Sequence, residues 1–313
     1  MKEIVFVSGK GGTGKTSLTA SIATIASRSS KIICADCDVD AADLHLIFQP
    51  IIRGRHDFTS GHVAKIDQMK CISSGICDVC MDLCRFDAIS YSERNGCQVN
   101  EAACEGCGVC VRFCPAKAID FPERHCGEWY LSETRFGPLV HASLDPGGEN
   151  SGKLVTAVRR EAKRVAEESS QTESPSSAIE YIIVDGSPGT GCPVIASITG
   201  ADAVVAVTEP TRSGLHDLER LASLARHFEV PVLVCINRAD INTEISASIE
   251  AWCGRNGISC IGTIPYNPVF TAAQIAGKSV VEYIENSSEQ KVGTAEVAEN
   301  LHHIWERICQ LKQ

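Results

Sequence analysis

The sequence lacks the features that mark several classes of protein. Its first ten residues are already predicted to form a strand and a loop, so we expect no signal or transit peptide, and no apolar run is long enough to span a membrane. No basic run exceeds a few residues and the formal net charge is −10, which argues against sequence-independent binding of nucleic acid. We therefore expect a cytoplasmic protein, and its 313 residues allow one large α/β domain or two domains.

Cysteine, in contrast, is abundant. The chain has 17 cysteines, of which nine fall between Cys71 and Cys114. Clustered cysteines in a chain without an export signal predict metal ligands rather than disulfides. The cysteines outside this region are scattered, mostly on apolar stretches, where a buried free thiol is common.

A glycine-rich segment near the start of the chain predicts a phosphate-binding loop. Residues 8–17 read SGKGGTGKTS, between an apolar strand expected over 4–7 and a helix expected over 18–26. In this context backbone N–H groups and the helix N-terminus bind phosphate oxygens. Lys15 is expected to neutralise the β- and γ-phosphates and Thr16 to bind Mg²⁺. The residues expected to bind the nucleotide here are Gly11, Gly12, Thr13, Gly14, Lys15, Thr16 and Ser17.

A second lysine, Lys10, lies inside this loop, where a generic phosphate loop has no fixed residue. With the glycines that follow, it resembles the deviant Walker A motif of the MinD/ParA/Mrp and nitrogenase Fe protein ATPases. The resemblance implies a homodimer formed with ATP, in which Lys10 reaches across the interface to the nucleotide of the other subunit. The alternative is an ordinary solvated loop lysine.

Two later strands end in aspartate. The strand expected over 31–35 is followed by Asp36 and Asp38, and the strand over 181–184 by Asp185 and a glycine-rich turn. Carboxylates at the carboxyl ends of such strands face the ligand crevice. The same family resemblance implies that Asp38 orients the attacking water, that Asp36 lies near Mg²⁺ and that Asp185 holds Mg²⁺ through water. The predicted catalytic residues are Lys10, Lys15, Asp38 and Asp185.

Two segments are expected to bind the base. Asn237 begins the sequence NRAD, which resembles the base-reading Asn-Lys-x-Asp segment of related NTPases. Arginine stands in place of the lysine, so the prediction that the base is adenine rather than guanine depends on the family resemblance. Pro265 begins the sequence PYNP, which resembles the segment that flanks adenine in these ATPases. The expected ligands are ATP and Mg²⁺.

From about residue 61 the strand–helix pattern stops and the cysteines begin. The motif CxxCxxCxxxCP is a complete bacterial ferredoxin run, in which three thiolates bind one iron–sulfur cluster and the fourth binds another. Zinc is the alternative. The run consists of Cys104, Cys107, Cys110 and Cys114.

An earlier run repeats this pattern imperfectly. Cys77, Cys80 and Cys84 are in place, but Ser74 stands where the first cysteine belongs and Cys71 lies three residues earlier. We expect two [4Fe–4S] clusters. The first is assigned to Cys71, Cys77, Cys80 and Cys114. The second is assigned to Cys104, Cys107, Cys110 and Cys84. If Cys71 does not reach its iron, the first site holds a three-iron cluster or uses Ser74.

Four other features complete the expectations. Cys97 lies outside both runs and is expected to be a free thiol. Cys192 lies seven residues beyond Asp185, where the nitrogenase Fe protein has one bridging-cluster cysteine, but 145–153 has no second cysteine, which argues against such a cluster. Residues 149–153 are expected to form either a helix cap or an interface loop near the nucleotide. The last helix, expected over 299–311, lacks a strongly basic polar face, so packing on the sheet is expected rather than the membrane binding of MinD.

The whole chain is similar to a MinD/ParA/Mrp-superfamily P-loop ATPase with an inserted two-cluster ferredoxin domain, as in the ATPases associated with the orange protein complex. The resemblance implies an α/β ATPase over 1–60 and 122–313, with a mostly parallel sheet and helices on both faces, and a small α+β ferredoxin-like insertion over 61–121. We expect a slow, partner-stimulated ATPase whose nucleotide state controls electron transfer to, or metallocluster assembly in, a partner protein. A MinD-like positioning ATPase with redox-sensing clusters and an iron–sulfur scaffold or carrier are the alternatives.

Overall fold

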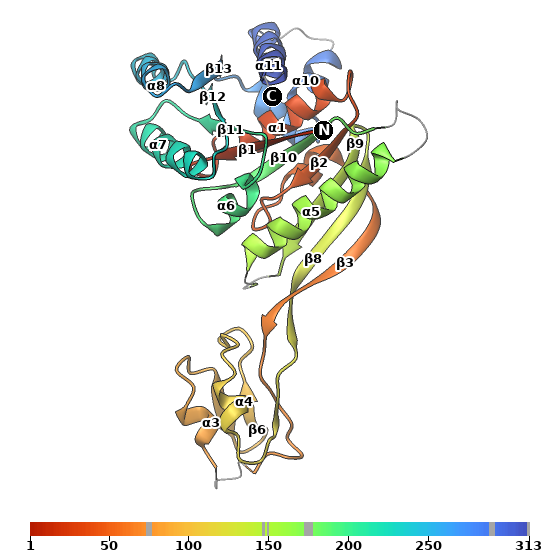
Figure 1. The fold of residues 1–313 in the computed structure, drawn as a ribbon, viewed down its shortest axis with the longest axis vertical. Coiled ribbons are helices and arrows are strands. Elements are labelled where there is room, and N and C mark those ends of the chain that lie inside the picture. The colour runs from red at the N-terminus through yellow and green to blue at the C-terminus, as the bar shows by residue number, and fades with distance from the viewer. Residues whose placement is uncertain (73–76, 146–147, 149, 172–177, 288–291, 312–313) are drawn as a thin grey trace. The chain divides into compact units, whose positions relative to one another are not determined.

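The computed structural model describes residues 1–313 except 73–76, 146–147, 149, 172–177, 288–291 and 312–313. Ser74 and Glu149 therefore lie outside the described residues. The chain divides into two compact units, which we describe separately (Figure 1). The sheet unit comprises Met1–His56, Trp129–Ser143 and Ser151–Gln313, and the cysteine unit comprises Asp57–Glu128 and Leu144–Asn150.

Nine strands form one sheet, and each pair of neighbours between β13 and β9 is parallel. From one edge to the other the strands are β13 (Ser259–Ile264), β12 (Val232–Asn237), β11 (Ala203–Thr208), β1 (Lys2–Ser8), β10 (Tyr181–Pro188), β2 (Ile32–Asp36), β9 (Gly137–Leu144), β8 (Glu123–Thr134) and β3 (Ile51–His62). The central strands are almost entirely buried because helices cover both of their faces. This arrangement confirms the predicted α/β fold with a mostly parallel sheet.

Helices pack on both faces of this sheet (Figure 1). On one face lie α1 (Lys15–Ala26), α2 (Leu44–Phe48), α9 (Val269–Ile275), α10 (Val280–Glu285) and α11 (Thr294–Cys309). The other face is covered by α5 (Ser151–Ser170), α6 (Cys192–Ile198) and α7 (Arg212–His227). A further helix, α8 (Thr243–Arg255), contacts β13. The side chain of Thr211 caps α7 by accepting from the Gly214 N–H.

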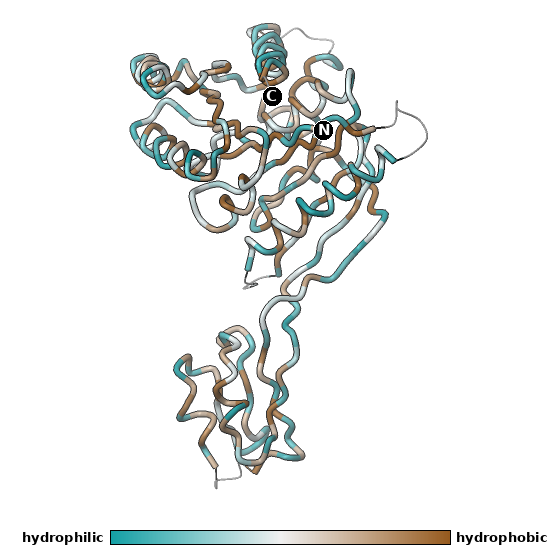
Figure 2. The backbone as a smooth tube through the Cα atoms, in the orientation of Figure 1, coloured by the Kyte–Doolittle hydropathy of each residue, from teal (hydrophilic) through white to brown (hydrophobic). Residues whose placement is uncertain are grey.

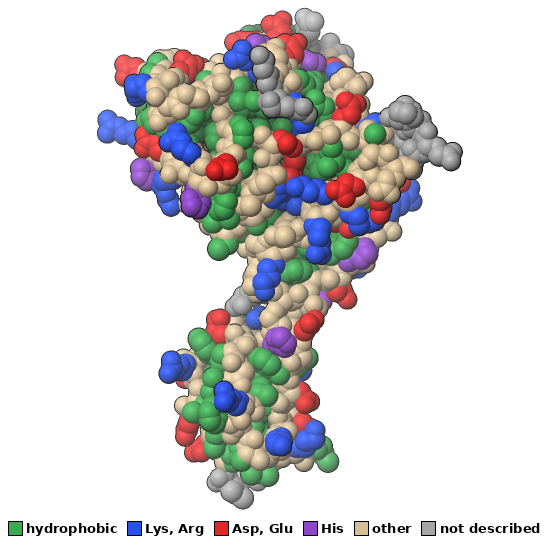
Figure 3. All heavy atoms as spheres, in the orientation of Figure 1, with side chains coloured by type: hydrophobic (Ala, Val, Ile, Leu, Met, Phe, Trp, Pro, Cys, Tyr) green, Lys and Arg blue, Asp and Glu red, His purple; other side chains and the backbone are tan. Residues whose placement is uncertain are grey.

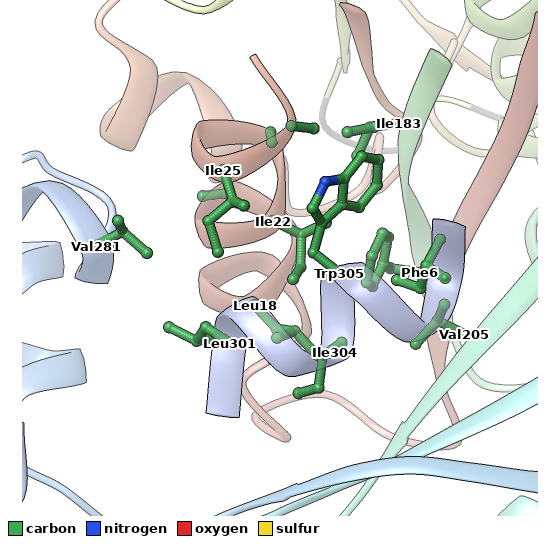
Figure 4. Close-up of a cluster of buried hydrophobic side chains, with 14 of the residues drawn as sticks. Phe6, Leu18, Ile22, Ile25, Ile183, Val205, Val281, Leu301, Ile304 and Trp305 are labelled. Atoms are coloured by element: carbon green, nitrogen blue, oxygen red, sulfur yellow. The ribbon is translucent and has the colours of Figure 1, made fainter. Parts of the chain in front are cut away.

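The main core lies between the sheet and α1 (Figure 4). Side chains alternate along a strand, so Ile4 and Phe6 of β1 point to the same face. There they pack with Ile22 of α1 and Trp305 of α11. The other residues of α11 in this core are Leu301, Ile304 and Ile308. The last helix therefore packs on the fold, as predicted. Among the described residues, no helix is long and apolar enough to cross a membrane.

Hydrophobic residues follow the strands, whereas polar residues lie on the outer sides of the helices (Figure 2). On the face of the sheet unit shown in Figure 3, basic and acidic side chains are interspersed. The edge strand β3 differs from the central strands, because only Phe58 and Ser60 among its 12 residues are buried. Both β3 and β8 contribute residues to the two units.

The cysteine unit is built from short elements and small buried residues. Helix α3 (Val79–Asp82) precedes the pair β5 (Ile89–Ser92) and β6 (Gly96–Val99), whereas α4 (Val109–Phe113) precedes β7 (Ile119–Asp120), which pairs with β4 (Lys65–Ile66). Asp87 and Lys117 occupy equivalent places in the two halves and have left-handed φ values of 49° and 50°. The repeat visible in the sequence is therefore also a repeat of the backbone.

Candidate functional site

Glycine shapes the loop between β1 and α1. Gly12 and Gly14 have φ values of 80° and 85°, in the left-handed region that favours glycine. A Cβ atom at Gly14 would lie 2.4 Å from Nδ2 of Asn237, so a side chain there would clash as well as strain the backbone. The loop leads directly into the N-terminus of α1, which carries a positive partial charge. This geometry suits an anion.

A cavity of about 420 Å³ lies against the loop, within the usual size range of small-molecule sites. Thr13 Oγ1 is buried without a hydrogen-bond partner among the described residues, so this hydroxyl is available to a ligand. The cavity is lined by most of the residues predicted to bind nucleotide, namely Gly11, Gly12, Thr13, Gly14, Lys15, Thr16, Ser17, Asp38, Asn237 and Pro265. Asp36 and Asp185 are fully buried beside it. Lys10 is half-buried and pairs elsewhere.

Lys15 is surrounded by carboxylates. Its Nζ atom lies 2.9 Å from Asp185 Oδ1 and 3.4 Å from Asp38 Oδ2, and its side chain is 6% exposed. Burial lowers the pKa of Lys15, but the charges of Asp185, Asp38 and Asp36 together outweigh burial, so the pKa lies above its usual value. The structure therefore keeps Lys15 charged, as the neutralisation of phosphate requires.

The first turns of α1 bind the carboxylate of Asp185. Thr16 Oγ1 donates to Asp185 Oδ2 at 2.6 Å, and Thr19 Oγ1 donates to Asp185 Oδ1 at 2.8 Å. Thr19 was not among the residues predicted from the sequence, although its position three residues after Thr16 places both hydroxyls on one face of the helix. A hydroxyl and a carboxylate are oxygen donors that Mg²⁺ accepts, so the residues present fit this ion.

Asp36, the last residue of β2, and Asp38, two residues later, have different surroundings. Asp36 accepts from the N–H of Asp38 through Oδ1 and from the N–H of Leu44 through Oδ2, each at 3.1 Å. Burial and the neighbouring charge of Asp185 raise the pKa of Asp36 well above its usual value. Asp38 lines the cavity, and burial raises its pKa to about 6. Asp36 therefore orders the chain between Asp38 and α2, whereas Asp38 presents its carboxylate to the cavity.

Asn237 and Pro265 bound another part of the cavity. Asn237 Nδ2 donates to the carbonyl oxygen of Thr13 at 2.7 Å, which braces the phosphate loop against the end of β12. Asp240 Oδ1 accepts from the N–H of Tyr266 at 2.5 Å and so orders the segment that contains Pro265. Asn237 also accepts from the N–H of Arg238 through Oδ1 at 3.0 Å and lines the cavity, and its base-reading role stays a prediction.

Glu209, at the end of β11, was also missed. Its Oε2 atom lies 3.2 Å from Nζ of Lys10, and its Oε1 atom pairs with Arg238, which lines the cavity. A carboxylate directly after an apolar parallel strand is the signal that identified Asp36 and Asp185, and it applies equally to Glu209.

The cysteine unit contains two small cavities, each lined by four cysteines. The first is lined by Cys71, Cys77, Cys80 and Cys114. The second is lined by Cys84, Cys104, Cys107 and Cys110. All eight are free thiols. These are the two sets grouped from sequence spacing, with the fourth cysteine of each run facing the other cavity.

Backbone N–H groups support the exchanged cysteines in the same way. The N–H of Ala88 donates to Cys84 Sγ and the N–H of Ala118 donates to Cys114 Sγ, both at 3.3 Å. Between Cys104 and Cys110, Gly106 has a φ of 60°, and a Cβ atom there would lie 2.4 Å from the carbonyl oxygen of His62. Each cavity is therefore lined by a sulfur atom that accepts a hydrogen bond from a backbone N–H group. Sulfur atoms at iron–sulfur sites accept hydrogen bonds in the same way.

Two cysteines outside the runs differ in their surroundings. Cys97 of β6 is fully buried, and its thiol lies close enough to Cys80 to affect that side chain. Burial first, and then Cys97 and Cys71, raise the pKa of Cys80 to about 12, so a bound cation would be needed to hold this cysteine as a thiolate. Cys192, at the start of α6, is exposed. The sequence showed that Cys97 lies outside both runs, but the spacing of the cysteines did not predict that Cys97 lies near Cys80.

Comparison with known proteins gives consistent results. A family model described as the CobQ/CobB/MinD/ParA nucleotide binding domain matches residues 4–280. The uncharacterized protein MJ0578 of Methanocaldococcus jannaschii is 32% identical over 240 residues, which cover 77% of this chain and 79% of that protein.

Two solved structures share the fold. The cell division ATPase MinD of Pyrococcus furiosus superposes with a TM-score of 0.56 at 16% identity, covering 99% of each chain. The MinC:MinD cell division protein complex of Aquifex aeolicus gives a TM-score of 0.56 at 18% identity, covering 100% of this chain and 98% of that one. The loop, the aspartates at the strand ends and the matched family model agree, and this chain belongs to the CobQ/CobB/MinD/ParA family of P-loop nucleotide-binding proteins.

Proposed function

We propose that the protein is a Mg²⁺-dependent ATPase that forms a homodimer with ATP and whose nucleotide state controls two iron–sulfur clusters in the cysteine unit. The observation that carries the proposal is the presence in one chain of a phosphate-loop cavity and two cavities that are each lined by four cysteines. Electron transfer to a partner protein, or metallocluster assembly in it, is the process that such clusters would serve.

The residues of the cavity have distinct roles in this proposal. The loop amides bind the phosphates, and Lys15 exchanges its contact with Asp185 for the β- and γ-phosphate oxygens. Asp38 orients the attacking water from the wall of the cavity. Thr16, Asp36 and Asp185 would hold Mg²⁺, which neutralises charge on the phosphates when it is bound. Lys10 contacts the nucleotide of the second subunit.

The eight cysteines are proposed to bind two [4Fe–4S] clusters, in the two sets that line the cavities. The lining of the first cavity by Cys71 supports this cysteine as the fourth ligand. Phe86, which follows Cys84 by two residues, and Phe113, which directly precedes Cys114, are 44% and 57% exposed, and hydrophobic side chains reach the surface of this unit (Figure 3). Apolar surface close to the cysteines suits docking of the partner protein.

A path for coupling between nucleotide and clusters runs along the chain itself. Asp36 holds the first turn of α2 through Leu44, and β3 begins three residues after the end of α2. The side chain of Arg135 donates to the carbonyl oxygens of Phe48 at 2.7 Å and Ile47 at 2.8 Å. A change at Asp36 would therefore act on α2 and on the strand that continues into the cysteine unit.

The proposal is tested by electron paramagnetic resonance on anaerobically purified, reduced protein, with no nucleotide, with Mg-ADP and with Mg-ATP. We expect about eight iron atoms per chain and two interacting four-iron signals whose shape or reducibility changes with Mg-ATP. Cys71→Ser tests the ligand that departs from the regular spacing of its run, and Cys126→Ser, which changes another cysteine of this unit, is the matched control. Tightly bound zinc without iron would refute the clusters, and spectra indifferent to nucleotide would favour the positioning ATPase.

A further inference from the structure

Glu209 occupies an unusual place between two cations. It directly follows β11, and its side chain is 11% exposed. One carboxylate oxygen lies 3.2 Å from Nζ of Lys10, whose side chain is 39% exposed, and the other oxygen pairs with Nη1 of Arg238. Arg238 lines the nucleotide cavity, whereas Lys10 belongs to the phosphate loop. A single carboxylate therefore joins the loop lysine to a residue of the cavity wall.

Because Arg238 also pairs with Glu209, Lys10 can leave this carboxylate at little cost. If Lys10 were the sole partner of Glu209, its departure would leave a largely buried carboxylate unpaired, which is strongly unfavourable. Arg238 remains paired with Glu209 when Lys10 leaves, so the carboxylate stays compensated. The backbone of Lys10 is meanwhile fixed, because Ser8 Oγ donates to its carbonyl oxygen at 2.8 Å. Lys10 can therefore change partners by rotation of its side chain alone.

We infer that Glu209 is a positioning residue that holds Lys10 within its own subunit and thereby sets the threshold for nucleotide-driven dimerisation. This inference rests on the proposed function, in which Lys10 contacts the nucleotide of the second subunit. Closing the dimer then exchanges one ion pair, Lys10 with Glu209, for another, Lys10 with phosphate. The free energy of the Lys10–Glu209 pair is lost when Lys10 contacts phosphate, so the pair within one subunit makes the dimer weaker.

The test compares Glu209→Gln with wild type by sedimentation of the full-length protein in saturating Mg-ATPγS. The amide keeps the shape of the side chain but carries no negative charge to attract Lys10, so we expect the dimer dissociation constant to fall about two- to thirtyfold, because two partly exposed ion pairs, one in each subunit, no longer oppose closure. Glu133→Gln is the matched control, because it removes the same charge from an exposed pair with Arg53 and should leave the constant unchanged. An unchanged or weaker dimer in Glu209→Gln would overturn the inference.

A second measurement separates this inference from the proposed function. The rate at which an amine-reactive reagent labels Lys10 in the nucleotide-free protein is read by peptide mass spectrometry. We expect faster labelling in Glu209→Gln and no change in Glu133→Gln. Faster labelling with no dimer in wild type would reject the proposed dimerisation while supporting the contact. Equal labelling of Lys10 in Glu209→Gln and wild type would reject the contact, whether or not wild type dimerises.

Discussion

The sheet unit and the cysteine unit are built on different physical principles. The sheet unit contains the largest fully buried side chains of the described residues, among them Phe6, Leu18 and Ile22. The buried apolar residues of the cysteine unit are fewer and smaller, and Ala88, Cys97 and Ala118 are typical of them. A small domain with little apolar surface to bury usually requires a metal or disulfides for stability. The comparison teaches that packing alone accounts for the first unit, whereas the second has little packing and would gain stability from the clusters that its cysteines are proposed to bind.

The largest effect is expected from loss of a cluster ligand. Cys110→Ser should remove the second cluster, so that iron falls from about eight to about four atoms per chain. Because the cysteine unit would lose much of its stabilisation, we expect it to be digested by protease far faster while the sheet unit still binds ATP. Iron analysis and limited proteolysis under anaerobic conditions provide the measurements. A cysteine unit that remained protease-resistant without iron would break the comparison.

Lys15→Ala should damage the sheet unit in a different way. The substitution removes the cation that lies among Asp185, Asp38 and Asp36, and breaking a buried pair of this kind costs about 3 kcal/mol of stability. Nucleotide affinity should also fall by roughly 100-fold or more, since every 1.4 kcal/mol is tenfold. Thermal unfolding and nucleotide titration measure the two effects. The iron content should stay at the wild-type value, and its loss would show that the units are not independent.

Lys10→Ala should separate nucleotide binding from dimerisation. Lys10 is half-buried and pairs with Glu209 rather than with the residues around Asp185, so we expect nucleotide affinity within about twofold of wild type and no detectable dimer. Titration and sedimentation in Mg-ATPγS measure both. A dimer that formed normally in this variant would refute the proposed mechanism of closure.

The smallest effect is expected at Cys97. This buried thiol contacts Cys80 of the first set, whereas among the described residues no extra cysteine is found in contact with Cys110 of the second. A hydrogen bond to a ligand sulfur stabilises the reduced cluster, so Cys97→Ala should lower the potential of the first cluster and leave the second unchanged. We expect a three- to tenfold change in the reduction equilibrium, where tenfold is about 59 mV for one electron. Redox titration followed by electron paramagnetic resonance measures it, with Cys126→Ala as the control, and equal shifts of both clusters would contradict it.

The parts of the molecule that could be predicted are those encoded by local spacing. The phosphate loop, the aspartates at the ends of β2 and in β10, and the spacing within each cysteine run are local patterns. The exchange of the fourth cysteine between the runs follows from the known arrangement of ferredoxin motifs. Buried strands were predicted because their apolar runs are continuous. The sequence therefore yielded the fold class and most of the side chains that line the cavity.

The remaining features depend on contacts between distant residues. Asn237 donates to Thr13, 224 positions away, and Glu209 joins Lys10 to Arg238, so no local pattern indicates either contact. Strand β3 escaped prediction because its side chains are mostly exposed and polar, without the alternation that marks a half-buried strand. Cys97 lies outside any regular spacing. These contacts arise only when the chain has folded.

The pairing of β3 with β8 also has an evolutionary consequence. The chain leaves the sheet unit along one strand and returns along its neighbour, and a Cβ atom at Gly54 would lie 3.8 Å from Cβ of Leu131. Two chain ends this close can be joined by a short turn at a small entropic cost. Gain or loss of the cysteine segment at this point of a gene would therefore leave β3 and β8 paired and the nucleotide-binding sheet in place.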